Sequence, residues 1–120
     1  MQVLTQVIPE KVHHVYNGAH SASELVMHMA AWRNFVIRKL QGEDTYEVSE
    51  QANFPSPTAW SQALDFLLIS QENLLSALSV FPENKLEDTV PGRSYSYAIM
   101  LYGIIHHDLY HLGQIRLLTK

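Results

Sequence analysis

The chain has 120 residues, of which 47% are hydrophobic, and a formal net charge of −4 with the histidines neutral. This length and composition suit one globular domain over residues 1–120. The eight Lys and Arg residues form no cluster, which argues against nucleic acid or an anionic membrane as a partner. Because cysteine is absent, disulfides, thiolate metal sites and a cysteine nucleophile are excluded. The sequence has neither a signal-type N-terminus nor a membrane-length apolar run, so we expect a cytoplasmic protein with no membrane partner.

The first half of the chain predicts two helical regions before a polar connection. We expect short helical pieces within residues 1–16, and Asn17-Gly18 predicts a turn. Residues 21–40 predict an amphipathic helix, because apolar side chains recur every three or four positions. Ser21 and Glu24 have the spacing of a capping box, and Gly42 ends the helix. His28 belongs to its apolar stripe.

Two further helices are predicted in the second half. The third starts near Ser56, with Pro57 at the first helical position, and is bounded by Pro82. After a loop over residues 81–93, the last helix is capped by Ser94 or Ser96 and runs to about Leu118. This helix is apolar on more than one face, which is typical of a helix that is buried on several sides or meets a partner. No strand alternation occurs, so the sequence predicts an all-α helical bundle.

His107 and His111 lie four residues apart in the last predicted helix. Residues with this spacing share one helical face, with Cβ atoms about 5–6 Å apart, and two such imidazoles can reach one metal ion. The same face carries Ile104 and Ile115, so we expect it to point into the core. His28, on the apolar stripe of another helix, is the candidate third ligand. Three protein ligands would leave a coordination position open, as in catalytic metal sites.

Other polar residues near these histidines are weaker candidates for the metal site. His106 is rotated off the shared face, and the capping role of Glu24 competes with a contact to a ligand histidine. Gln114 lies about one turn after His111 and near its face, where it either supports a ligand histidine, contacts a substrate or packs. Asp108 replaces the glutamate of the metalloprotease signature and points away from the pair, which argues against a peptidase. We assign the remaining aromatic and histidine candidates to core filling or solvated turns: Tyr95, Tyr110, Trp32, Trp60, His13, His14 and His20.

Three stretches of the chain resemble the DinB-like family, also called DinB/YfiT-like. They are Gly18 to Trp32, the lead-in Pro91-Gly92-Arg93-Ser94-Tyr95-Ser96-Tyr97, and Gly103 to Ile115, which contains His-His-Asp-Leu-Tyr-His. The resemblance implies a four-helix bundle with a divalent metal ion, zinc or nickel, held by His28, His107 and His111. This chain departs from the family in its shortened first helix, which would leave part of one wall open. A homodimer would cover the apolar surface exposed there.

Two functions are consistent with these residues. In the first, the protein is a divalent-metal-dependent enzyme acting on a small molecule. The resemblance implies a thiol-dependent transferase that uses a low-molecular-weight thiol, and a hydrolase with metal-activated water is the other enzyme option. In the second, it is a dimeric stress-related protein that binds a metal or ligand without catalysis. A third interpretation has no metal, and the three histidines then hydrogen-bond one another through water.

Overall fold

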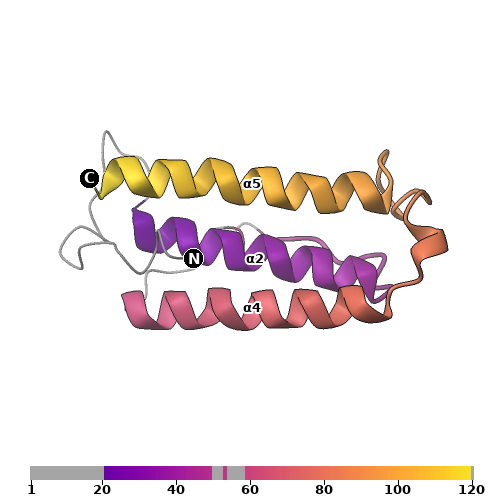
Figure 1. Cartoon of the computed structure of the whole chain (residues 1–120), viewed down its shortest axis with the longest axis horizontal. Helices are drawn as coiled ribbons and strands as arrows, with labels where there is room; N and C mark the ends of the chain where they lie inside the picture. Colours follow the sequence, from indigo (N-terminus) through magenta and orange to yellow (C-terminus); the bar gives the residue numbers. More distant parts are fainter. Residues whose placement is uncertain (1–20, 50–52, 54–58, 120) are drawn as a thin grey trace.

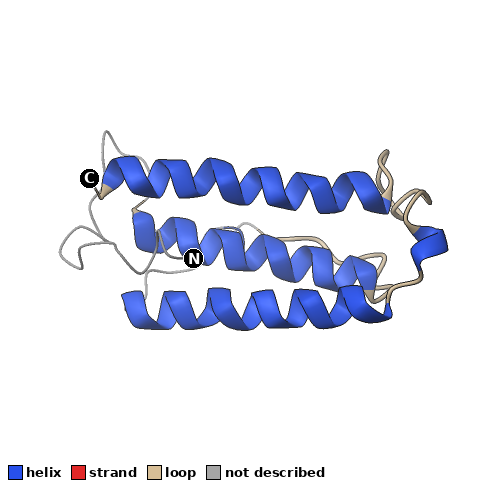
Figure 2. Cartoon of the chain, viewed as in Figure 1, coloured by secondary structure: helices blue, strands red, loops and turns tan. Residues whose placement is uncertain are grey.

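The computed structural model describes residues 21–49, 53 and 59–119. Within these ranges the chain is helical, with α2 (Ala22–Leu40), α4 (Trp60–Val80), the 3-10 turn η2 (Glu83–Lys85) and α5 (Tyr97–Leu118) (Figure 2). The described residues form no strand, and a single antiparallel bridge joins Thr89 to Ser96. The predicted all-α class is therefore confirmed. The predicted shortened first helix lies outside the described residues, which contain three α-helices rather than four.

Local sequence signals account for most helix ends. The Ser21 hydroxyl accepts from the Glu24 amide and the Glu24 carboxylate accepts from the Ser21 amide, so the predicted capping box is present. Gly42 follows α2 with φ +88°, a left-handed conformation that favours glycine after a helix. Of the two candidate caps for α5, Ser96 is the one used, and its hydroxyl accepts from the Ile99 amide.

The start of α4 differs from the prediction near Ser56. Its cap is Ala59, whose backbone is extended with ψ 145°, and the helix begins at Trp60. The α4 helix therefore starts later than the predicted position near Ser56, and the predicted first helical residue, Pro57, lies outside the described residues. The predicted boundary at Pro82 is confirmed, because α4 ends at Val80.

Helix α2 lies between the other two long helices (Figure 1). It packs against both α4 and α5 and runs parallel to α4 and antiparallel to α5. Residues 41–59 return the chain from the end of α2 to the start of α4, which places these consecutive helices in the same direction. No helix in the described ranges is long and apolar enough to cross a membrane.

The buried apolar residues form two clusters along α2. The first contains Leu25, Met29 and Ile115, and the second contains Phe35, Met100 and Ile104. On α5, His107 and His111 lie between Ile104 of the second cluster and Ile115 of the first, whereas on α2 His28 lies next to Met29, the last α2 residue of the first cluster. The interior of the bundle is therefore apolar at both ends and carries a layer of imidazoles between them.

Candidate metal centre

Three imidazoles converge between α2 and α5. His107 Nε2 lies 3.0 Å from His28 Nε2 and 3.1 Å from His111 Nε2. One nitrogen from each ring lies within 4.8 Å of the other two. The helix spacing that places His107 and His111 on one face also turns both toward α2. The structure therefore brings together all three residues that the sequence predicted as metal ligands.

Hydrogen bonds orient two of these rings. His28 Nδ1–H donates to the backbone carbonyl of Asn53 at 2.7 Å, and His111 Nδ1–H donates to Gln114 Oε1 at 2.6 Å. An imidazole whose Nδ1 carries the proton presents a lone pair at Nε2, which is the form that binds a metal ion. Partners of this kind are usual for metal-ligating histidines, because they fix the tautomer and the ring orientation.

The nitrogens of the cluster are arranged as a shared divalent cation would require. His107 Nε2 faces the lone pairs of both His28 and His111, and one N–H hydrogen cannot lie along both contacts. A shared cation would satisfy all three lone pairs. Two nitrogens each roughly 2.0–2.1 Å from one ion lie roughly 2.9–3.4 Å apart at octahedral or tetrahedral angles. The separations of His107 Nε2 from His28 and from His111 fall in this range, and the ligand atoms of all three rings lie within 4.8 Å of one another.

The third ring lies beside a buried ion pair. His107 Nδ1 lies 3.8 Å from Asp108 Oδ1, which is too long for a hydrogen bond, and neither atom has another such partner among the described residues. The other carboxylate oxygen accepts from Arg33 Nε at 2.9 Å and from Arg33 Nη2 at 2.6 Å. Both side chains are largely buried, so Asp108 is held with its second oxygen beside His107.

Access to the cluster is uneven. His28 and His111 are 6% and 8% exposed, whereas the side chain of His107 is 27% exposed. The cluster is therefore most open to solvent on the side of His107. Among the described residues, Asp108 and Arg33 are the charged side chains that take part in hydrogen bonds or ion pairs around the three rings.

The remaining candidates fall in different places. His106 is exposed, and Glu24 caps α2 as predicted. Tyr110 is 66% exposed, with its ring 5.3 Å from that of His111, while Tyr95 lines a groove beside His107. Trp32 and Trp60 are both partly buried but pack against different core clusters. The candidates His13, His14 and His20 lie outside the described residues.

Asn53 and Arg33 were missed by the sequence interpretation. Asn53 accepts from His28 through its backbone carbonyl and from the Trp32 indole N–H through its side chain at 2.7 Å. It stands in the connection after α2, where no periodic pattern marks it. Arg33 could have been noticed as a charged residue within an apolar stripe. Its partner Asp108 is 75 positions away, and local spacing cannot identify such a pair.

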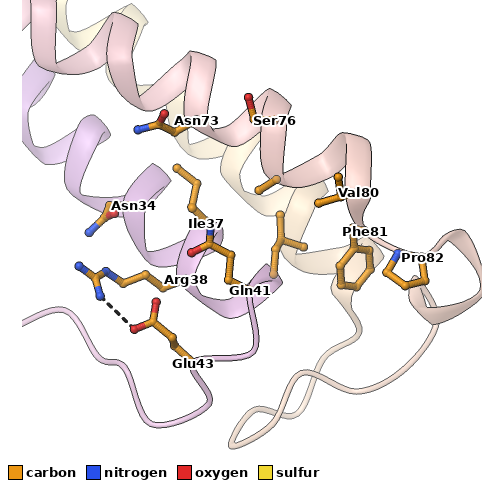
Figure 3. Close-up of a pocket in the computed structure, with 12 residues that line it drawn as sticks. Asn34, Ile37, Arg38, Gln41, Glu43, Asn73, Ser76, Val80, Phe81 and Pro82 are labelled. Atoms are coloured by element: carbon orange, nitrogen blue, oxygen red, sulfur yellow. Dashed lines mark hydrogen bonds and ion pairs between the residues drawn. The ribbon is translucent and has the colours of Figure 1, made fainter.

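A large pocket in the described part of the chain lies away from the imidazoles (Figure 3). It has a volume of about 610 Å³ and lies between the last turns of α2 and α4. The charged side chains at its edge, Arg38 and Glu43, pair with each other at 3.0 Å. No histidine lines it, so its size alone does not connect it with metal chemistry.

The fold and the site together define an all-helical protein with a convergent cluster of three histidines. A sequence profile described as the DinB superfamily matches residues 2–115, so the chain belongs to this superfamily. No curated protein and no solved structure matches the chain.

Proposed function

We propose that this protein binds a divalent metal ion through His28, His107 and His111 and uses it to act on a small molecule. The observation that carries the proposal is the convergence of three Nε2 atoms, two of them on rings whose Nδ1 already donates elsewhere. Neutral imidazole suits zinc and nickel, which we propose as the metals. Membership in the DinB superfamily is compatible with such a site.

The protein contributes three ligands, which leaves room on the metal for an exogenous one. When bound, the metal would supply Lewis acidity, lowering the pKa of a coordinated thiol or water so that a nucleophile forms near neutral pH. Any thiol must come from a separate small molecule, because the chain has no cysteine. We therefore propose thiol-dependent group transfer as the reaction and hydrolysis as the alternative.

The His107→Ala variant tests the metal site, with His106→Ala as its matched control on the same helix. Protein purified without an affinity tag should bind about one equivalent of zinc or nickel, measured by elemental analysis after dialysis. His107→Ala should lose at least about tenfold in affinity, whereas His106→Ala should retain it, because its side chain is exposed and outside the cluster. Equal, negligible metal in the wild type and His107→Ala would favour a polar core without metal.

A second measurement on the same samples distinguishes a thiol-dependent enzyme from a protein that binds metal without catalysis. Low-molecular-weight thiols should raise the melting temperature of the metal-loaded protein, and a chelator should remove the increase. A metal-loaded protein that responds to no thiol would instead favour hydrolysis or ligand binding without catalysis.

We also propose that the protein is a homodimer. Large apolar side chains are exposed along α5, including Tyr102, Leu109 and Leu117, which are 66%, 61% and 74% exposed. Large exposed apolar patches mark interaction sites in soluble proteins, and these three residues all belong to α5. A second copy is the occupant we favour, since one apolar helix face can pair with its symmetry mate.

A further inference from the structure

An apolar groove lies between α2 and α5, directly beside the candidate metal centre. Its volume is about 320 Å³, and its lining contains no Asp, Glu, Lys or Arg. Trp32 and Phe35 form an aromatic wall on α2, with ring centroids 5.2 Å apart. An engineered cavity of about 150 Å³ binds benzene, so this groove is large enough for a substituted aromatic ring.

The groove is continuous with the histidine cluster through one residue. His107 lines the groove and also contributes Nε2 to the cluster, and it is the most exposed of the three imidazoles. The indole of Trp32, whose centroid lies 6.1 Å from that of His107, is oriented by its hydrogen bond to Asn53. The backbone carbonyl of Asn53 accepts the hydrogen bond from His28, so one residue orients both a wall of the groove and a ring of the cluster.

Gly103 keeps the space beside His107 open. It lines the groove one helical turn before His107, and a Cβ built on it would meet no atom within 4 Å. A side chain at this position would enter the groove rather than the core.

We propose that this groove binds the apolar, aromatic part of an uncharged small molecule whose oxygen, nitrogen or sulfur donor occupies the open position on the metal. The inference rests on the proposed function and names its substrate class. Three features favour a small aromatic molecule over a protein segment as the occupant of the groove. The groove lies beside the candidate metal centre, no charged residue lines it, and Gly103 leaves a gap in its wall.

Two hydroxamates that differ only in an apolar group test the proposal in zinc-loaded protein. Benzohydroxamate should bind about tenfold more tightly than acetohydroxamate, because the groove covers its phenyl ring. Gly103→Leu, which fills the groove, should abolish this preference. Gly113→Leu is the matched control, because Gly113 also lies in α5 with nothing within 4 Å of a built Cβ but does not line the groove. Zinc content should be the same in all three proteins.

A measurement on the metal-free protein tests aromatic binding in the groove independently of the metal site. In nitrogen-15 NMR spectra of the apo protein, fluorobenzene should shift the Gly103 amide and the Trp32 indole signal and leave the Gly113 amide unchanged. If the protein binds no zinc, the proposed function is wrong, and so is the link between the groove and the metal. The NMR measurement on the apo protein still shows whether the groove binds an aromatic ring.

Three results would overturn the groove as an aromatic site. The first is zinc binding with no preference for the phenyl compound, and the second is a preference that survives in Gly103→Leu. The third is dissociation of a dimer by Gly103→Leu, which would show that a second copy covers the groove.

Discussion

At the scale of single residues, the cluster depends on what each imidazole does with its Nδ1 atom. His28 uses a backbone carbonyl, which substitution cannot easily remove. His111 uses the side chain of Gln114, one turn further along α5, and this contact can be altered without changing any ligand. His107 has Asp108 at 3.8 Å, held there by Arg33. Gln114 is therefore the clearest place to test how surrounding hydrogen bonds affect the metal.

We predict that Gln114→Ala lowers metal affinity about tenfold, because His111 loses the acceptor that fixes its ring and tautomer. Gln114→Glu should retain the affinity, since a carboxylate accepts the same hydrogen bond. Competition with a chromogenic chelator measures both variants against the wild type. Equal affinity in Gln114→Ala and Gln114→Glu would mean that packing alone orients His111.

At the scale of helices, α5 combines strong local signals with a weak amphipathic pattern. Its cap at Ser96 and its length follow from sequence, but apolar residues occur around its whole circumference. Two of its residues are glycine, and neither is crowded by neighbouring atoms. Gly113 is exposed and outside the groove, so no contact in the described structure requires a glycine there.

Two glycine-to-alanine changes should therefore have opposite effects on stability. Gly113→Ala should stabilise the fold by up to about 1 kcal/mol, because alanine has the higher helix propensity. Gly42→Ala should destabilise it by about 1 kcal/mol, because Gly42 has φ +88° and a Cβ is strained in that conformation. Urea denaturation followed by circular dichroism gives both values. A stabilising Gly42→Ala would contradict the left-handed turn after α2.

At the scale of the whole molecule, the described helices leave apolar surface uncovered on both sides of α2. Exposed apolar residues lie on α4, including Phe66 and Ile69, as well as on α5. The two outer helices contact α2 rather than forming an extensive contact with each other. A bundle of this form gains stability when another surface covers its outer helices, and the proposed dimer would provide that cover through α5.

Sedimentation analysis should give twice the chain mass of 13.7 kDa for the wild type. Replacing Leu109 and Leu117 together by glutamate should shift the protein to monomer, because two buried carboxylates would oppose the apolar contact. Val80→Glu on α4 is the matched control, since Val80 is 81% exposed and lies on the other outer helix. A monomeric wild type would rule out the dimer, and dissociation by Val80→Glu alone would place the interface on α4.

The helices and the candidate ligands could be predicted from the sequence because both depend on local spacing. The capping box at Ser21, the end of α2 near Gly42 and the shared face of His107 and His111 are each set within about one or two helical turns. The resemblance of the same motifs to the DinB-like family agrees with the superfamily match over residues 2–115.

Only the tertiary structure decided what supports and surrounds the cluster. The pairing of Arg33 with Asp108, the contacts of Asn53 with His28 and Trp32, and the groove beside His107 join residues from different helices and from the connection after α2. Helical periodicity determines which face a residue occupies, but not which distant face packs against it. His28 and His107 are 79 positions apart, and their contact exists because α2 packs against α5 in the register that places both rings at one level.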